Sequence, residues 1–267
     1  MKTSLPALLT TISCVFVMTA CSDAALSGSP APAPAPSTSA SAPDAGAGDA
    51  AAPAKLAHGV LVIGPLAAAD ADSAKAQHDP LASGGEAQAK AAGDVGHAAL
   101  VSTTRLGTKA NEFLGFDRWS APDNLDAFYA NPDFAAAFGK LFSGPPTRGV
   151  YVKRADWAGW GDLDQRPGRF WVAVRGVLKE KDEAKARAAH DAVARGGEAA
   201  AKQAGDVAHV VYLSRDTPAG FLAFDVWSDA DALEKFYADP QVQAGFGGLF
   251  EAAPTVGVYG TTDFHQW

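Results

Sequence analysis

The sequence predicts an α+β fold in which two βαββαβ units pack sheet to sheet as an intrachain α/β barrel. Three observations lead to this prediction. A long segment occurs twice, each copy alternates between strand and helix periods in the same order, and the predicted strands are apolar on both faces. The hydrophobic content of 48% is sufficient for a core of that size.

The repeat is read directly from matching segments. AGDVGHAAL at 92–100 returns as AGDVAHVVY at 204–212, a shift of 112 residues. Further along, FLGFDRWS at 113–120 returns as FLAFDVWS at 221–228, a shift of 108. The difference of four residues predicts a longer turn in the first copy, within TTRLGTKANE at 103–112.

The first half of each copy has the pattern of a strand followed by a helix. In the second copy an apolar strand pattern at 169–178 precedes a helical pattern at 181–205. Gly196 and Gly197 lie inside this helix and predict a break or kink, because glycine is a poor helix former.

The second half of each copy has the pattern of two strands, a helix and a last strand. In the second copy the two strands lie at 206–214 and 220–228, joined by a turn. Ser228 is expected to cap a helix that Pro240 restarts, and a strand at 255–261 ends the unit. The order β-α-β-β-α-β is that of the ferredoxin-like unit.

The apolar character of both sheet faces predicts the barrel. A single unit has helices on only one side of its sheet, so the other side needs a cover. In the strand at 206–214, Val211 and Leu213 alternate with Val210 and Tyr212, which leaves neither face polar. We therefore expect the two units to pack sheet against sheet with their helices outside.

The segment from the third strand into the second helix carries a family resemblance. FDVWSDADALEKFYADPQVQAGF at 224–246, with its copy at 116–142, is similar to the antibiotic biosynthesis monooxygenase group of the dimeric α/β-barrel superfamily. The resemblance implies a sheet-to-sheet dimer, here fused into one chain and therefore expected to be monomeric. It also implies a ligand pocket in each unit between the sheet and its helices.

Members of this superfamily include cofactor-free oxygenases of aromatic polyketides, quinone-directed oxygenases, heme-degrading enzymes and proteins without known activity. The heme-degrading members have a histidine ten residues after the tryptophan of the third strand. Here Tyr129 and Tyr237 occupy that spacing after Trp119 and Trp227. We therefore expect no heme, and the resemblance implies no other cofactor.

Four histidines are candidate site residues. His97 and His209 lie on the second strand of each unit, where each is either a general base or a core histidine. His78 and His190 lie on the first helix at its predicted sheet-facing edge. They are expected either to approach the strand histidines within a ligand site or to contact the aspartate that follows each of them.

The third strand carries an aspartate two positions before a tryptophan in both copies: Asp117 with Trp119, and Asp225 with Trp227. A carboxylate on a half-buried face beside an indole could act as the base in a cofactor-free oxygenation, or it could lie in water at the end of the strand.

The aromatic residues of these segments are candidate ligand-binding residues. Trp119 and Trp227 lie on the same strand face as the aspartates. Tyr129 and Tyr237 follow a phenylalanine on the second helix and are read either as pocket-lining residues or as amphipathic core.

Other site classes lack the necessary spacing. Two histidines and one aspartate per unit are ligand types that suit zinc or non-heme iron, but they lie on different predicted elements, so no metal is expected. The segment GPLAAADADSAK at 64–75 lacks the repeated glycines of a phosphate-binding loop. The net charge of -8 argues against a nucleic-acid partner.

The amino-terminal segment predicts export and lipid anchoring. Residues 1–20 resemble a signal peptide, and MTAC at 18–21 resembles a lipobox that would place an acylated Cys21 at the start of the mature chain. Residues 21–56 are rich in Ala, Pro and Ser and are expected to form a disordered tether. In a Gram-negative cell, Ser22 after the cysteine favours the outer membrane of the cell envelope.

The predicted order of the chain continues with a first unit at 57–157, a linker at 158–168 and a second unit at 169–267. The function predicted first is binding of a small apolar or aromatic ligand, with weak or no catalysis. A cofactor-independent monooxygenase acting on an aromatic or quinone-like substrate is the alternative. A structural module whose histidines belong to the core remains open as a third.

Overall fold

A computed structural model describes residues 57–120 and 122–267 of the chain. The predicted signal peptide at 1–20, the lipidation residue Cys21 and the tether at 21–56 lie outside the described residues. Within the described part, no helix combines the length and the apolar character that crossing a membrane requires.

The elements of the two units follow the predicted order. The first unit comprises β1 (His58–Pro65), α1 (Ala71–Ala92), β2 (Asp94–Ser102), η1 (Arg105–Gly107), β3 (Glu112–Trp119), α2 (Pro122–Tyr129), α3 (Pro132–Gly139) and β4 (Thr147–Lys153). The second unit comprises β5 (Phe170–Val177), α4 (Glu183–Ala204), β6 (Asp206–Ser214), β7 (Gly220–Trp227), α5 (Ala230–Ala238), α6 (Pro240–Leu249) and β8 (Thr255–Thr261).

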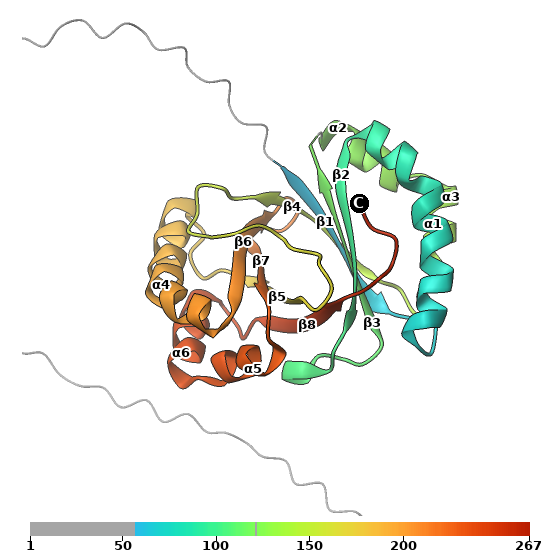
Figure 1. Ribbon diagram of the computed structural model, residues 1–267. Helices are drawn as coiled ribbons and strands as arrows, with labels where there is room; N and C mark the ends of the chain where they lie inside the picture. The colour runs from blue at the N-terminus through green and yellow to red at the C-terminus, as the bar shows by residue number, and fades with distance from the viewer. Residues whose placement is uncertain (1–56, 121) are drawn as a thin grey trace, which may run out of the picture. The chain divides into compact units, whose positions relative to one another are not determined.

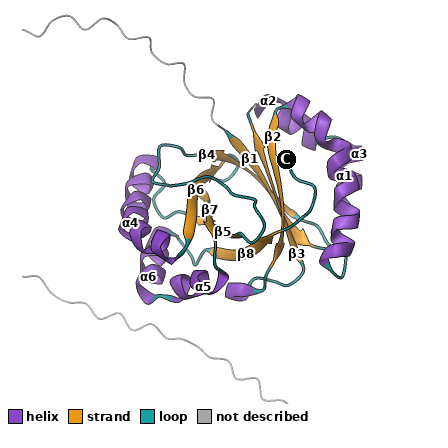
Figure 2. Ribbon diagram, in the orientation of Figure 1, coloured by secondary structure: helices purple, strands orange, loops and turns teal. Residues whose placement is uncertain are grey.

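The strands form one closed barrel in the order β1-β3-β2-β8-β5-β7-β6-β4. Each unit contributes four neighbouring strands, and two seams join the units. At one seam β2 pairs with β8, and at the other β4 pairs with β6, both antiparallel. Figure 1 shows the two sheets facing each other, and Figure 2 shows the helices on the outside. The predicted intrachain barrel is confirmed.

Aromatic and aliphatic side chains from both units fill the barrel interior. Phe116 of β3 and Phe224 of β7 meet with ring centroids 4.7 Å apart, and both are fully buried. Trp171 and Tyr212 pack against Phe224 from β5 and β6. Separate apolar clusters lie between each sheet and its own helices. Both faces of each sheet are therefore buried, as the apolar strands predict.

Two local predictions are wrong. The first helix of the second unit does not break at Gly196 and Gly197, since α4 is continuous over 22 residues. Its contacts with the sheet outweigh the helix-destabilising effect of glycine, which is about 1 kcal/mol per residue. Ser228 does not cap α5, because the N-cap is Asp229. The hydroxyl of Ser228 instead donates to the carbonyl of Gly205 at 3.0 Å.

Two pairs of repeated glycines have structural explanations. Gly93 and Gly205 end α1 and α4 with φ of 111° and 107°, a left-handed conformation that favours glycine. Gly64 and Gly176 lie where an added Cβ would come within 2.7 Å and 2.6 Å of phenylalanine rings. Their repetition reflects packing of the outer sheet face rather than ligand chemistry.

The longer turn of the first unit extends to the second unit. Arg105 lies within 2.7 Å of Glu234 and 2.9 Å of Asp231, both on α5. Thr108 Oγ1 accepts a hydrogen bond from the backbone N–H of Val258 at 2.8 Å. The shorter turn of the second unit makes an equivalent ion pair with the first unit, since Arg215 lies 2.8 Å from Asp126 on α2.

Replacing Phe224 with alanine should lower the free energy of unfolding by about 3–5 kcal/mol, because it leaves a cavity between the two sheets. Denaturant titration followed by circular dichroism measures the change. Val95→Ala is the control: Val95 is 57% exposed, and its loss should change stability by no more than about 0.5 kcal/mol. An equally small effect of Phe224→Ala would contradict a close-packed barrel interior.

Candidate functional site

The predicted site residues of each unit meet on the outer sheet face, beneath the helices. In the first unit His97 comes from β2, Asp117 from β3, His78 from α1 and Tyr129 from the end of α2. Adjacent antiparallel strands bring His97 and Asp117 into register as cross-strand partners. The sheet thus positions one half of the site and the helices position the other.

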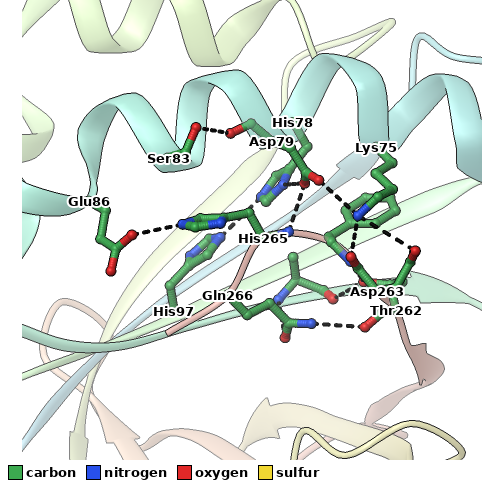
Figure 3. Close-up of polar contacts among 12 residues, drawn as sticks. Lys75, His78, Asp79, Ser83, Glu86, His97, Thr262, Asp263, His265 and Gln266 are labelled. Atoms are coloured by element: carbon green, nitrogen blue, oxygen red, sulfur yellow. Dashed lines mark hydrogen bonds and ion pairs between the residues drawn. The ribbon is translucent and has the colours of Figure 1, made fainter.

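These side chains form one continuous polar chain in the first unit. His78 Nδ1 lies 3.1 Å from Asp79 Oδ1, and His78 Nε2 lies 3.1 Å from His97 Nε2. His97 Nδ1 lies 2.5 Å from Asp117 Oδ1, and the hydroxyl of Tyr129 donates to Asp117 Oδ2. Figure 3 shows the two imidazoles meeting between α1 and the sheet, with Asp79 at the outer end.

The second unit repeats this polar chain with nearly the same geometry. His190 lies 3.2 Å from Asp191 and 3.1 Å from His209. His209 Nδ1 lies 2.5 Å from Asp225 Oδ1, and the hydroxyl of Tyr237 donates to Asp225 Oδ2. Each helix histidine contacts both a strand histidine and the aspartate that follows it.

Trp119 and Trp227 also lie beside these chains. Each is fully buried, with its ring 5.9 Å from Tyr129 in the first unit and 6.2 Å from Tyr237 in the second. Every sequence-predicted residue of the described units is therefore brought to one of two equivalent sites.

The contacts of the ring nitrogens determine where the protons of each histidine pair lie. Each Nδ1 faces a carboxylate and carries a hydrogen, while the Nε2–Nε2 contact needs one hydrogen more. Two imidazoles therefore share three ring protons. Burial and the neighbouring histidine lower the pKa of His78 and of His190 to about 4. The helix histidines are therefore neutral, and the extra proton belongs to the strand histidine paired with its aspartate.

The strand histidine of the first unit is stabilised in its charged form. Burial lowers the pKa of His97, but the carboxylates of Asp117 and Asp94 outweigh burial and raise the pKa above its ordinary value. The pKa of His97 is raised and that of His78 is lowered, although the two imidazoles are in direct contact.

A second carboxyl in each unit was not among the predicted site residues. Asp94 and Asp206 begin β2 and β6, and each accepts a backbone N–H two residues on. Burial and the neighbouring Asp117 raise the pKa of Asp94 to about 7, whereas burial and Asp225 raise the pKa of Asp206 to about 9. Arg118 lowers the pKa of Asp94, and its counterpart in the second unit is the uncharged Val226.

A tryptophan that the sequence interpretation missed covers each strand histidine. Trp267 stacks on His97 with ring centroids 4.6 Å apart, and Trp160 packs on His209 at 4.9 Å. In both cases the backbones of the tryptophan and the histidine exchange two hydrogen bonds. Trp160 lies inside the segment predicted to be only a linker.

The segments that follow β4 and β8, here called the tails, also belong to the repeat. Residues DWAGW at 156–160 match DFHQW at 263–267 at a shift of 107, which differs from the two shifts that reveal the rest of the repeat. The backbone N–H of Ala158 donates to Asp191, and that of His265 donates to Asp79, both at 2.7 Å. The shift of 107 differs from the shifts of 112 and 108 found elsewhere, and only two of the five residues are identical. The sequence pattern therefore did not indicate this match.

The tails are exchanged between the units. The tail that follows β4 of the first unit covers the site of the second unit, and the tail that follows β8 covers the site of the first (Figure 1). In Figure 3 the tail residues His265 and Gln266 lie over α1 and β2, where His265 contacts Glu86 at 2.8 Å. Each site is therefore built from both units.

The two sites differ in the space beside the polar chain. In the first unit His97, Asp117 and Tyr129 border a cavity of about 50 Å³. In the second unit His209, Asp225 and Tyr237 border a cavity of about 410 Å³. A cavity of roughly 150 Å³ holds a benzene molecule, so only the second cavity is large enough for an aromatic ring.

Among residues 57–120 and 122–267, no group of three or more His, Cys, Asp or Glu side chains is arranged to hold a metal ion. The Asp and His side chains of each site instead extend in a line, with each donor atom used by its neighbour in the polar chain. The arrangement suits proton transfer and hydrogen bonding.

No family model matches the sequence, and no curated protein is significantly similar to it. Solved structures are similar in fold. An anthrone oxidase-like protein aligns over 80% of this chain and 93% of its own, with a TM-score of 0.56 and 14% identity. A candidate monooxygenase from Fusobacterium nucleatum aligns over 77% of this chain and 92% of its own, with a TM-score of 0.55 and 11% identity.

A candidate monooxygenase from Lactobacillus acidophilus aligns over 76% of this chain and 93% of its own, with a TM-score of 0.50 and 11% identity. Each alignment covers more of this chain than one unit contains and therefore extends over both. This is the fold of the dimeric α/β-barrel proteins, with both halves in one polypeptide.

The two units of the barrel differ in the side chains beside their cavities. In the first unit Phe134 of α3 packs on Phe128 at 5.0 Å and on Phe138 at 5.5 Å. At a shift of 108 its counterpart in the second unit is Val242 of α6, which borders the larger cavity. A phenyl ring therefore occupies space in one unit that an isopropyl group leaves open in the other.

Replacing Asp206 with asparagine should stabilise the barrel at alkaline pH. The folded protein holds the Asp206 proton up to about pH 9, whereas the unfolded chain releases it near the ordinary value of 3.8. Rising pH between these values therefore favours unfolding of the wild type, by at most about 1.4 kcal/mol per pH unit. Asparagine has no such titration and retains the acceptor for Ala208.

The measurement is the difference in unfolding free energy between wild type and Asp206→Asn at pH 5 and pH 8. The difference should shift in favour of the variant at pH 8. A difference that is independent of pH would show that Asp206 is already ionised in the folded protein.

Proposed function

We propose that the second unit binds a small apolar or aromatic ligand in the cavity between its sheet and its helices. The observation that carries this proposal is the difference in volume between the two equivalent cavities, about 410 Å³ against about 50 Å³. A core would be expected to close both cavities, because close packing stabilises a protein interior. A partly open cavity that only one of two homologous units retains is the feature expected of a binding site.

The residues bordering the larger cavity suit an aromatic ligand with a polar edge. Its walls include the rings of Trp160, Phe236 and Phe246. Polar groups converge at one side, where Asp206, Asp225, His209 and Tyr237 lie together. A mainly apolar cavity with a few grouped polar side chains is typical of small-molecule sites. The raised pKa of Asp206 leaves its carboxyl able to donate a hydrogen bond near neutral pH.

We also propose that the barrel is held at the cell envelope through acylated Cys21, as an exported lipoprotein of the outer membrane. The signal-like residues 1–20 and the Ala/Pro/Ser-rich segment at 21–56 support this proposal. The lipid would be the only contact with the membrane. Because both barrel seams form within one chain, the protein would act as a monomer.

Anthrone should bind the purified barrel at a stoichiometry of one, and Val242→Phe should weaken that binding by about tenfold or more, because the added phenyl ring fills the cavity. Isothermal titration calorimetry measures both quantities. Phe134→Val alters the equivalent position in the first unit and should leave the affinity of the second-unit site unchanged. Anthrone binding that is unaffected by Val242→Phe would place the ligand elsewhere and overturn the proposal.

A cofactor-independent monooxygenase is the second candidate function. It is favoured by the buried Asp225–His209 pair beside the cavity. The fold neighbour described as an anthrone oxidase-like protein gives the class of substrate to test. Removal of a proton from an electron-rich aromatic compound would produce an anion that reduces O₂ directly. With anthrone the balanced reaction consumes one O₂ and yields anthraquinone and water.

If the second unit catalyses this reaction, Asp225→Asn should lower the rate of anthrone-dependent O₂ consumption by about a hundredfold or more, because the amide cannot accept the proton. An oxygen electrode, with anthraquinone followed by absorbance, measures the rate. Asp117→Asn makes the same change in the first unit and should have little effect. Equal rates in wild type and Asp225→Asn would leave ligand binding as the function.

A further inference from the structure

The polar chain of the second unit connects the cavity to the protein surface. Its inner end is Asp225 with Tyr237, which border the cavity. Its outer end is Asp191 on α4, whose side chain is 11% exposed. Asp191 also borders a surface groove with Asp156, Arg187 and Arg195 among its walls. Four hydrogen-bonding groups therefore span the layer between the cavity and solvent.

The charges at the outer end of this chain favour release of a proton from Asp191 to solvent. His190 is neutral, and its Nε2 accepts a hydrogen bond from His209. Its Nδ1 carries a hydrogen and donates it to Asp191. His190 can therefore take up a proton at Nε2 and give one up at Nδ1. Asp225, Asp206 and Tyr237 face the inner end. At the outer end Arg187 and Arg195 lie 3.7 Å and 3.5 Å from Asp191 and stabilise its carboxylate form.

We propose that Asp225, His209, His190 and Asp191 form a proton relay between the ligand cavity and solvent. The ligand end of this relay rests on the proposed binding function. The ligand class that would use it is an aromatic compound with a weakly acidic hydroxyl or C–H group. The relay gives the proton of such a ligand a path that ends at the groove beside Asp191, on the other side of the polar chain from the cavity.

The transfer is balanced along the chain. The ligand gives a proton to Oδ2 of Asp225, directly or through the Tyr237 hydroxyl, and the His209 Nε2 proton moves to His190 Nε2. The His190 Nδ1 proton moves to Asp191, which releases it to solvent. The four groups hold three protons before and after, the ligand has lost one, and solvent has gained one. Reprotonation of the ligand reverses each step, so no further reactant is needed.

The first unit contains the same chain beside a cavity of about 50 Å³. His78, His97, Asp79 and Asp117 have matching distances, but the cavity is too small for an aromatic ligand. This makes the first unit an internal control, because its histidines have the same packing role without the proposed ligand.

Exchange of the His209 ring N–H with water tests the relay without any ligand. In ¹⁵N-labelled protein, NMR magnetisation transfer from water should show that His190→Gln slows this exchange by about tenfold or more, because the path through Nε2 and Nδ1 is lost. A purely structural His190 predicts the opposite, since its loss would loosen the site and speed the exchange. Faster or unchanged exchange would therefore overturn the relay.

Asp191→Asn is the second variant, and its position at the groove leaves the buried imidazoles in place. It should also slow exchange at His209. His78→Gln removes the equivalent histidine of the first unit and should leave the exchange at His209 unchanged. A similar slowing with His78→Gln would mean that the effect is global rather than transmitted along the chain, and would also overturn the relay.

A pair of matched probes tests the ligand end. 1-Naphthol should release a proton on binding, detected by a pH indicator in weakly buffered solution, whereas naphthalene should bind without release. Asp191→Asn should slow the release while leaving naphthalene affinity unchanged, because Asp191 borders the surface groove and not the cavity. Binding of 1-naphthol without proton release would contradict the ligand end of the relay. Failure of naphthalene to bind would contradict the proposed binding function, and the exchange measurement would still decide the relay.

Discussion

Burial of an apolar sheet face on each unit is the constraint on which the rest of the structure depends. A βαββαβ unit covers one side of its sheet with helices and leaves the other side without a partner. Here the rings of Phe116 and Phe224 meet across that interface, and strand pairing at two seams closes the barrel. The seams bring the end of each unit beside the second strand of the other unit.

That placement is the reason the tails are exchanged. β4 pairs with β6, so the chain that leaves β4 runs over the outer face of the second unit and brings Trp160 onto His209. β8 pairs with β2, and Trp267 reaches His97 in the same way. The barrel therefore does more than stabilise the units, because neither histidine pair would be covered in an isolated unit.

Duplication within one chain also explains how the sites could diverge. In a homodimer a change at the position of Phe134 would alter both cavities, whereas here Val242 alters only one. Both units nevertheless keep the Asp–His–His–Asp chain at nearly identical distances. The polar chain therefore has a packing role that both units share, and the open cavity adds a second role in one of them. Burial of several ionisable groups opposes folding unless they are paired, which explains why every member has a partner.

The sequence by itself determined the repeat, the order of elements and the barrel, and it named the histidines, aspartates and tyrosines as candidates, because periodicity and matching residues are local signals. It did not determine that α4 stays unbroken at Gly196 and Gly197, since packing on the sheet offsets a weak local propensity. Only the tertiary structure decided that Trp160, Trp267 and Asp206 belong to the sites, because strand pairing between the units brings distant segments together. The difference between the cavities was likewise decided by side-chain packing from several elements, which the spacing of residues along the chain does not record.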